Sequence, residues 1–374
     1  MADDLPSERT FAVVTGGGTS GHVLPALAIA ESLVAAGHAV ESLHYVGTSR
    51  GVESRLVPAA GLAHTLYDVS GLQRSLSRRN LMFLPRLVSS TWKAIRLLRR
   101  LRPQVVVNVG GYASFPATFA ARLLRIPTVI VSYDRRPGLV SRLLARGATA
   151  CAVAFRDSSL PRAEHTGAPV RRQLIELDRT AQRAAARTEL GLPADRFVVA
   201  VVCGSLGARA VNDAVIGAVE QLAARRDLCV YHVVGDRFVG EAAPQRDGRE
   251  GIMYRVIGYE DRMAQLYAAA DLLVTRAGAG TIAELATVGA PAIVVPWPGA
   301  AENHQVDNAR TLADIGAAIM IEQTDLTVAR LVLEIERLSV SPDTLRALSM
   351  SAREAGAMHR SGALVSLIER VAAR

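Results

Sequence analysis

Short runs of apolar residues alternate with longer stretches of helical periodicity along the first half of the chain. The first run, at residues 11–15, ends in glycines and precedes a helical pattern at 25–36. Further strand-like runs follow at 42–46, 105–109, 128–131 and 149–153. Apolar strands separated by helices are typical of a parallel sheet that is covered on both faces. We therefore expect a doubly wound α/β domain in this half.

The same alternation restarts in the second half, after a turn-rich segment at residues 166–172. A strand at 196–203 leads through glycines into a helix at 211–224, and later strands are expected at 229–235, 253–257, 272–275 and 292–296. The last stretch, 341–374, has a largely helical pattern. We predict two doubly wound domains, at 1–168 and 169–345, that face each other across a cleft. Ligands in such sheets bind at the carboxyl ends of the strands.

Composition excludes several classes of protein. The chain has 374 residues, of which 50% are hydrophobic and 21% charged, so it can bury two cores and is not disordered as a whole. Its three cysteines form no C-x-x-C pair, which argues against a disulfide scaffold or a cysteine-rich zinc site and fits a reducing compartment. The polar, acidic start does not resemble a signal peptide, and no apolar run is long enough to span a membrane.

The net charge of +8 comes from one stripe of the sequence. Residues 71–103 hold nine basic side chains and no acid, so the rest of the chain is close to neutral. Leucines and two aromatic residues, Phe83 and Trp92, alternate with these charges. An apolar face beside a basic face is what a helix on an anionic membrane surface requires, although nucleic acid and partner proteins also bind such segments. Nucleic acid is less favoured, because two aromatics are too few for a stacking platform.

A glycine turn follows the first strand and leads into the first helix. Gly16, Gly18 and Gly21 have the spacing of a loop that holds a dinucleotide pyrophosphate. The acid that such a site places at the end of the second strand is missing, and no Gly-Lys-Ser/Thr sequence of a Walker loop is present. His22 stands at the helix start, where a neutral imidazole beside backbone N–H groups suits a general base for a hydroxyl.

Three segments of the second half carry similar chemistry. Ser205 lies in a second glycine turn, where its hydroxyl and the neighbouring amides can donate to phosphate oxygens. Glu284 follows a third glycine turn, where a carboxylate can accept hydrogen bonds from both hydroxyls of a ribose. The segment at 296–309 is rich in amide, His and acid side chains that suit sugar hydroxyls. The sequence has no D-x-D motif and no metal-ligand spacing, so no metal is expected at the diphosphate.

Six motifs occur in one order that identifies a family. They are Gly17–Val23, Gly110–Tyr112, Thr166–Arg171, Gly204–Arg209, Gly278–Glu284 and His304–Ala309. With them the chain resembles the MurG family of bacterial peptidoglycan N-acetylglucosaminyltransferases over nearly its whole length. The resemblance implies the GT-B fold, that is, two Rossmann-like domains, with a terminal helix at 346–374 that returns to the first domain.

The resemblance also implies a reaction. The family transfers N-acetylglucosamine from UDP-N-acetylglucosamine to the 4-hydroxyl of N-acetylmuramoyl-pentapeptide on undecaprenyl diphosphate (lipid I), with inversion at the anomeric carbon. It uses no cofactor and no metal at the donor diphosphate. It works as a peripheral protein on the cytoplasmic face of the cell membrane, where a basic and apolar patch of the first domain meets the lipid acceptor and the anionic membrane surface.

Individual residues match the family's functional positions. His22 matches the proposed base, Arg171 a donor-contacting arginine, and Ser205 the serine at the UDP phosphates. The other donor-binding matches surround the transferred sugar, the uracil and the ribose: Thr19, Ser20, Gly21, Asp134, Tyr259, Glu260, Ala279, Gly280, Thr281, Glu284, His304 and Gln305. The membrane patch is expected at Arg78, Arg79, Leu81, Phe83, Leu84, Arg86 and Trp92.

The chain departs from the family pattern at several of these positions. Ser20, Leu206 and Ala168 replace a usual glycine, glutamine and asparagine, and the family's His-Glu-Gln-Asn run is Val-Ser-Tyr-Asp at 131–134. Asp134 thus stands where an asparagine commonly touches the donor sugar, and a carboxylate cannot donate as an amide does. We favour the family's own reaction. The alternatives are a paralogue that uses another acceptor or sugar nucleotide, a nicotinamide-dependent oxidoreductase and a membrane-bound scaffold without catalysis.

Overall fold

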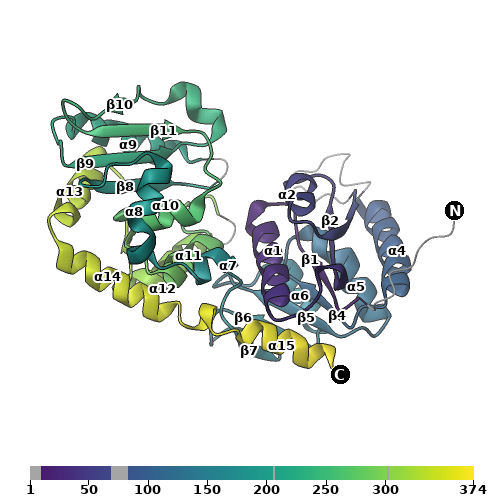
Figure 1. Ribbon diagram of the computed structural model, residues 1–374. Helices are drawn as coiled ribbons and strands as arrows, with labels where there is room; N and C mark the ends of the chain where they lie inside the picture. Colours follow the sequence, from purple (N-terminus) through teal and green to yellow (C-terminus); the bar gives the residue numbers. More distant parts are fainter. Residues whose placement is uncertain (1–9, 69–82, 205–206, 301–302) are drawn as a thin grey trace. The chain divides into compact units, whose positions relative to one another are not determined.

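The chain divides into two compact units (Figure 1). The structure is a computed structural model that describes residues 10–68, 83–204, 207–300 and 303–374. Unit 1 comprises residues 1–172 and 358–374, and unit 2 comprises residues 173–357. Each unit holds its own sheet and its own hydrophobic core.

Unit 1 is built on a seven-stranded parallel sheet. In spatial order its strands are β3 (Ala63–Tyr67), β2 (Leu43–Thr48), β1 (Ala12–Thr15), β4 (Val105–Asn108), β5 (Thr128–Ser132), β6 (Ala150–Val153) and β7 (Ala163–His165). The last residue of β1, Thr15, pairs with Val46 on one side and with Asn108 on the other. Strand order reverses between β1 and β4, which makes this edge the topological switch point of the sheet.

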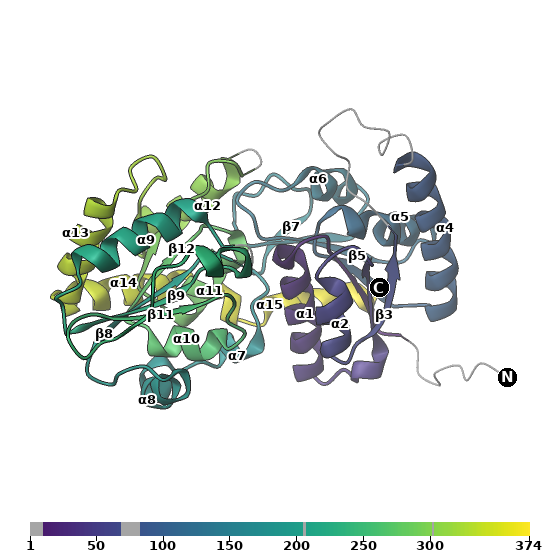
Figure 2. The same cartoon turned by 90° about the horizontal axis from the view of Figure 1, so that it is seen from above.

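Helices cover both faces of this sheet (Figure 2). Right-handed crossovers place α1 (Ser20–Ala35) and α2 (Glu53–Ala59) on one face, and α4 (Phe83–Leu101), α5 (Phe115–Leu123) and α6 (Leu139–Ala145) on the other. The last helix, α15 (Ala363–Ala372), packs against α1 and against β4, β5 and β6. The C-terminal segment therefore completes the core of unit 1.

Helix α4 is amphipathic in the structure. Its buried face contributes Ala94, Leu97 and Leu98 to a cluster with Val106 of β4 and the alanines of α5. Burying side chains of this size stabilises the fold by about 1.5–3 kcal/mol for each large one. The opposite face exposes Trp92, of which 59% remains accessible. The basic stripe predicted from the sequence therefore contains a surface helix with an exposed aromatic side chain.

Unit 2 repeats the same architecture with one antiparallel edge strand. The spatial order is β10 (Arg246–Asp247), β11 (Met253–Ile257), β9 (Leu228–Val233), β8 (Phe197–Val202), β12 (Leu272–Thr275), β13 (Ala292–Val294) and β14 (Ile319–Met320). Only β10 pairs in the antiparallel direction among these described strands. The switch point lies between β8 and β12, and both strands are followed by a glycine turn.

The helices of unit 2 enclose its sheet. They are α8 (Arg179–Leu190), α9 (Arg209–Gln221), α10 (Met263–Ala269), α11 (Ala279–Val288), α12 (His304–Ala313), α13 (Val328–Ser339) and α14 (Pro342–Ala355). Helices α9 and α13 pack together over a cluster of valines and leucines from the central strands. Helix α8 packs on α10, and α14 packs on α11 and α13. A short helix, α7 (Arg172–Ile175), lies at the first boundary between the units.

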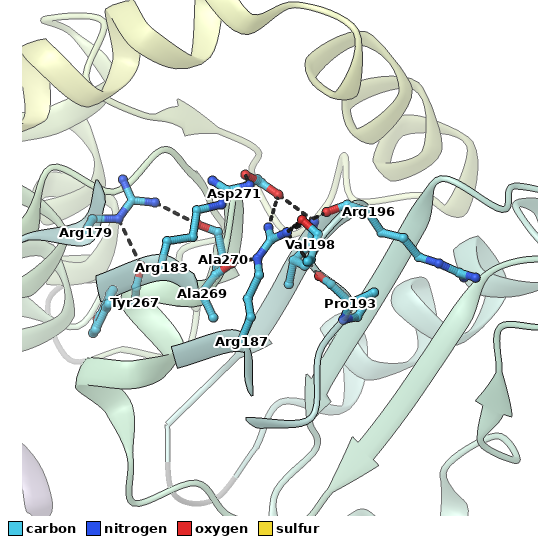
Figure 3. A network of polar contacts seen from close by, with 11 residues as sticks. Arg179, Arg183, Arg187, Pro193, Arg196, Val198, Tyr267, Ala269, Ala270 and Asp271 are labelled. Atoms are coloured by element: carbon cyan, nitrogen blue, oxygen red, sulfur yellow. Dashed lines mark hydrogen bonds and ion pairs between the residues drawn. The ribbon is translucent and has the colours of Figure 1, made fainter. Parts of the chain in front are cut away.

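A network of arginines ties α8 to the amino ends of the central strands (Figure 3). Arg187 is buried and donates to Asp271 at 2.8 Å, and Asp271 also accepts from Arg183 at 2.5 Å and from the Val198 amide at 2.8 Å. Burial lowers the pKa of Arg187, and the neighbouring Asp271 opposes that shift. Val198 and Asp271 lie at the start of β8 and just before β12. The network is thus at the edge opposite the glycine turns and has a structural role.

The predicted strands of both halves are present, and so is the doubly wound α/β fold. The sequence pattern missed β3, β7, β10 and β14, which are short strands at or near the sheet edges. Exposed polar residues interrupt β3, β7 and β10, whereas β14 is apolar but only two residues long. Helix α1 begins at Ser20, earlier than the expected residue 25. The chain returns to unit 1 at Met358, later than the expected residue 346, because α14 packs within unit 2.

Candidate active site at the two switch points

The first glycine turn forms a loop that is held in place by hydrogen bonds with neighbouring side chains. Gly17 and Gly18 have positive φ angles of 148° and 93°, which favour glycine. The Tyr45 hydroxyl donates to the Gly16 carbonyl at 2.7 Å, and the Gly18 amide donates to Glu53 Oε1 at 2.7 Å. Glu53 is completely buried, and its Oε2 has no hydrogen-bond partner among the described residues. The loop conformation is therefore fixed by β2 and α2 as well as by its own glycines.

His22 stands in the first turn of α1 and is half-buried. Its Nδ1 lies 3.0 Å from Thr19 Oγ1. The ring packs against the turn after β4, where a Cβ added at Gly110 would lie 3.1 Å from His22 Cδ2. That turn is held in place by Asn108, whose Oδ1 accepts from the Gly110 amide at 2.7 Å. The two turns of the switch point thus meet at the imidazole.

The end of β5 contacts the same loop through Tyr133. The buried Tyr133 hydroxyl donates to the main-chain carbonyl of Gly21. Burial raises the pKa of Tyr133 well above its usual value, and the neighbouring Asp134 adds to the shift. Asp134 itself is half-buried. The structure therefore brings Thr19, Gly21, His22 and the 133–134 pair to one edge of unit 1.

In unit 2 the third glycine turn leads directly into α11. Arg276 stabilises the turn by donating to the Val295 and Pro296 carbonyls and to Gln323 Oε1, the last at 2.7 Å. A Cβ added at Gly280 would meet no heavy atom within 4 Å, so the start of the helix is uncrowded. Helix α11 has no acid in its first turn and no side-chain cap. The amides of its first turn have no partner within the helix, and with the positive end of the helix dipole they suit an anion.

The expected nucleotide and sugar residues lie on this turn or on the neighbouring ones. Ala279 is buried, whereas Gly280, Thr281 and Glu284 are half-buried on α11. Gln305, in the first turn of α12, accepts through Oε1 from the Trp297 amide at 2.9 Å and from the Ala277 amide at 3.3 Å. This one side chain therefore connects the turns that follow β12 and β13. His304 is the first residue of α12 and is half-buried.

Tyr259 and Glu260 follow β11, the next strand but one from β8. Tyr259 is 44% exposed, but Glu260 is buried. The Glu260 carboxylate accepts from the Tyr231 hydroxyl at 2.5 Å and from the amide and side chain of Arg262 at 2.9–3.2 Å. These hydrogen bonds lower the pKa of Glu260, against the effect of its burial. We infer that Glu260 shapes the turn instead of presenting its carboxylate to a ligand.

The structure describes some of the remaining expected residues and not others. Ser205, Arg78, Arg79 and Leu81 lie outside the described residues. Ser20 begins α1, and Phe83 and Leu84 begin α4. Arg171 and Arg86 are half-buried, and Trp92 is exposed.

One face of α4 carries a shallow groove. It is lined by Pro85, Val88, Ser89, Trp92, Lys93 and Arg96, and the Arg96 guanidinium stacks over the Trp92 ring at 5.3 Å.

Glu53 and Tyr133 support the loop although no sequence motif includes them. For Tyr133 a signal existed, since Pro25 has no N–H to give the Gly21 carbonyl four residues earlier. For Glu53 the only signal is its position a few residues beyond the end of β2, close to the strand end at which the dinucleotide-binding pattern predicts an acid. That acid binds the loop's own amide, not a ribose.

Comparisons with known proteins agree with this architecture. Residues 12–153 match the glycosyltransferase family 28 N-terminal domain, and residues 198–363 match its C-terminal domain. The crystal structure of Acinetobacter baumannii MurG aligns with a TM-score of 0.73 at 28% identity, covering 98% of this chain and 100% of that chain. The glycotransferase of kitacinnamycin, at 18% identity and a TM-score of 0.67 over 96% and 99% of the two chains, shares the fold.

Curated relatives are similar over almost the whole length. A protein of Desulforudis audaxviator is 37% identical over 97% of this chain and 98% of its own length. One of Cutibacterium acnes is 39% identical over 91% and 92%. Both are named UDP-N-acetylglucosamine–N-acetylmuramyl-(pentapeptide) pyrophosphoryl-undecaprenol N-acetylglucosamine transferase. With both family 28 domains and these relatives, the chain belongs to the MurG family of GT-B glycosyltransferases.

Proposed function

We propose that this protein transfers N-acetylglucosamine from UDP-N-acetylglucosamine to undecaprenyl-diphosphate-linked N-acetylmuramoyl-pentapeptide in peptidoglycan synthesis. The observation that carries the proposal is the similarity to relatives of that name over more than nine-tenths of the chain. Glycine turns at the switch points of both sheets support it, because open α/β sheets bind ligands there.

The arrangement around His22 supports its role as the general base. In the tautomer whose Nδ1–H donates to Thr19 Oγ1, Nε2 carries the lone pair that can accept a proton. As the acceptor oxygen bonds to the anomeric carbon, that carbon's bond to the UDP oxygen breaks and its electron pair leaves with UDP. The hydroxyl proton passes to Nε2. Attack on the face opposite the leaving group inverts the anomeric centre.

Unit 2 has the groups that a departing nucleoside diphosphate requires. The uncapped start of α11 offers backbone N–H groups and the positive end of the helix dipole. Helix α9 also begins without a side-chain cap, directly after the second glycine turn. Both helix starts would stabilise negative charge on the leaving diphosphate. Arg171, at the boundary of unit 1, is the expected cationic partner.

Sugar recognition is assigned to the turn that Gln305 holds. Its carbonyl oxygen is engaged by two backbone amides, so its amide nitrogen is the group that would donate to a sugar oxygen. His304 precedes it in the same helical turn. Asp134 of unit 1 would accept a hydrogen bond from a donor-sugar hydroxyl, where the family's asparagine can also donate. This substitution is the specific reason to compare sugar nucleotides in the test below.

We assign membrane contact to the exposed face of α4. Trp92, Lys93 and Arg96 line its groove, and an aromatic ring beside cationic side chains suits the headgroup region of an anionic bilayer. Within the described part of the chain, no helix combines the length and apolarity needed to cross a bilayer. From the family resemblance and the exposed face of α4, we infer a peripheral location on the cytoplasmic face of the membrane, where the lipid-linked acceptor would be reached.

A nucleotide screen followed by a transfer assay tests the proposed function. Thermal unfolding is measured with UDP, UDP-N-acetylglucosamine, UDP-N-acetylgalactosamine, UDP-glucose and NAD(P). A ligand at one hundred times its Kd stabilises the native state by about 2.7 kcal/mol. We expect stabilisation by the uridine nucleotides, and transfer of N-acetylglucosamine to a short-chain analogue of the lipid acceptor.

The same screen separates the alternatives. Preference for another sugar nucleotide, or no transfer to the lipid analogue, would favour a paralogue with a different substrate. Stabilisation by NAD(P) alone would favour an oxidoreductase. Binding to vesicles without stabilisation by any nucleotide would favour a non-catalytic membrane scaffold and would refute the proposed function.

A further inference from the structure

We propose that Tyr267 is a positioning residue for the donor ribose, because its hydroxyl orients the Glu284 carboxylate. The inference rests on the proposed function, which takes UDP as the ligand of this edge of unit 2. Tyr267 lies on α10 and Glu284 on α11, and the sequence motifs point only to the second of these residues. The relationship between them is visible only in the folded unit.

A hydrogen bond between Tyr267 and Glu284 connects helices α10 and α11. The Tyr267 hydroxyl donates to Glu284 Oε2 at 3.0 Å. Tyr267 is almost completely buried, with 1% of its surface accessible, whereas Glu284 is half-buried. The phenol therefore approaches the carboxylate from the protein interior, and Glu284 reaches the less buried side of α11.

The tyrosine is itself held firmly at its main chain. Arg179 of α8 donates to the Tyr267 carbonyl at 2.9 Å and to the Ala270 carbonyl at 2.8 Å, so it binds the last turn of α10 (Figure 3). The same guanidinium donates at 2.8 Å to the carbonyl of Gly289, the residue that ends α11. Burial lowers the pKa of Arg179 to about 10, and the nearby Asp271 opposes this shift. One arginine thus fixes the ends of both helices that carry the Tyr267–Glu284 pair.

The consequence for a ribose follows from the number of acceptor sites on a carboxylate. Two oxygens offer about four lone pairs, so Glu284 can accept from Tyr267 and from the 2′- and 3′-hydroxyls at the same time. A glutamate side chain on a helix surface otherwise samples several rotamers, and ligand binding must then select one of them. A carboxylate that is already oriented binds more tightly, because this ordering cost has been met on folding.

Ribose-specific binding measurements test this inference. Calorimetry compares UDP with 2′,3′-dideoxy-UDP for the intact chain, for Tyr267→Phe and for a control, Tyr254→Phe. The control also removes a buried hydroxyl from unit 2, one that contacts His232 at 2.9 Å and lies outside the proposed site. We expect Tyr267→Phe to weaken UDP binding about five- to tenfold, the loss of one net hydrogen bond, and to leave the dideoxy analogue unaffected. Tyr254→Phe should change neither affinity.

A double-mutant cycle with Glu284→Ala, which removes both carboxylate acceptors, gives the second readout. If Tyr267 acts through Glu284, its substitution costs little UDP affinity once the carboxylate has been replaced, so the two effects are not additive. In steady-state kinetics Tyr267→Phe should raise the KM for the sugar nucleotide and leave kcat within about twofold.

Two results would overturn the inference. One is equal UDP affinity for Tyr267→Phe and the unmodified chain, and the other is a loss of equal size for UDP and its dideoxy analogue, which would indicate general loosening of unit 2. Failure of the proposed function is distinguishable from both, because it would appear in the unmodified chain itself, as no binding of uridine nucleotides or no transfer to the lipid analogue.

Discussion

The Tyr133 hydroxyl donates a hydrogen bond to the carbonyl of Gly21, the acceptor that Pro25 leaves without a helical donor. A proline inside a helix lacks the N–H that would bind the carbonyl four residues earlier. Tyr133, at the end of β5, supplies the missing donor from 112 residues away in sequence. Because Gly21 immediately precedes His22, this hydrogen bond fixes the backbone on which the proposed base is mounted.

Removing this hydroxyl should therefore affect activity as well as stability. We expect Tyr133→Phe to lower the free energy of unfolding by about 0.5–1.5 kcal/mol, the net contribution of one hydrogen bond, because Gly21 is itself exposed and water can replace the lost donor. The kcat should fall more than the affinity for UDP, since the change lies next to His22 and the nucleotide is assigned to unit 2. Denaturant unfolding and steady-state kinetics measure the two effects. Tyr133→Gln, which keeps a donor at this position, should recover part of both, and an unchanged kcat in Tyr133→Phe would contradict the prediction.

The buried carboxylate beneath the glycine turn gives a second prediction. Glu53→Ala leaves the Gly18 amide without its acceptor and should destabilise unit 1 by about 1–3 kcal/mol. Glu53→Gln keeps an oxygen that can accept from the amide, so its effect should be smaller. Amide hydrogen exchange at Gly18, with the free energy of unfolding, compares the matched pair. Equal exchange rates in the two variants would show that Glu53 does not hold the loop.

Local signals in the sequence predicted the frame of this site well. The sequence places His22 at the carboxyl edge of the first sheet, because an apolar strand precedes the glycines and a helical pattern follows them. Two of these glycines have the positive φ angles that favour glycine. Buried central strands such as β1 and β4 are continuous apolar runs, which periodicity detects. The same approach located the turn before α11, because its glycines also follow such a strand.

The supports of the site could not be predicted in this way, since each acts across a long sequence separation. Glu53 contacts a residue 35 positions earlier, and Tyr133 one that is 112 positions away. A sequence pattern describes neighbours along a strand or helix and does not specify which side chains from different elements meet. Glu260, whose position matches the family's uracil site, likewise has its carboxylate bound by Tyr231 and Arg262, contacts that the motif does not specify.

If His22 is the general base, its replacement should lower kcat without weakening the binding of UDP. We expect His22→Ala to reduce kcat by about 10²–10⁴, the range for loss of a general base, while the Kd for UDP changes less than about twofold. Thr19→Val should cause a smaller loss, because it removes only the group that orients the imidazole. Steady-state kinetics and calorimetry with UDP check both. Full activity in His22→Ala would refute the assignment.

Membrane contact through α4 predicts a charge-dependent affinity for vesicles. Reversing Lys93 and Arg96 together to Glu should weaken binding to phosphatidylglycerol vesicles at least tenfold, since each basic residue near such a surface contributes about 1 kcal/mol. Trp92→Ser should weaken binding by loss of apolar contact, with less dependence on salt. Cosedimentation with vesicles measures both effects. Arg249→Glu, at an exposed position of unit 2, is the matched control. Unchanged binding in the α4 variants would exclude this surface.

Buried neutral histidines give a prediction about acid stability. Burial lowers the pKa values of His44, His232 and His359 from 6.5 to about 4, with smaller effects of Arg100 on His44 and of Arg360 on His359. Between pH 6.5 and 4 the unfolded chain binds protons that the folded chain does not. The free energy of unfolding must therefore fall as the pH decreases through this window, by about 1.4 kcal/mol per pH unit for each group.

His359 allows this contribution to be isolated. Its Nδ1 accepts a hydrogen bond from the Ala168 amide at 3.0 Å, so protonation of that nitrogen would remove an acceptor that joins the C-terminal segment to the segment after β7. Glutamine can accept the same hydrogen bond but does not titrate. Between pH 6.5 and 4 we expect the free energy of unfolding of His359→Gln to fall less steeply than that of the unmodified chain, by about 1.4 kcal/mol per pH unit. Above pH 6.5 the two curves should be parallel. Denaturant unfolding at each pH gives both curves, and curves that stay parallel below pH 6.5 would show that His359 titrates normally in the folded chain.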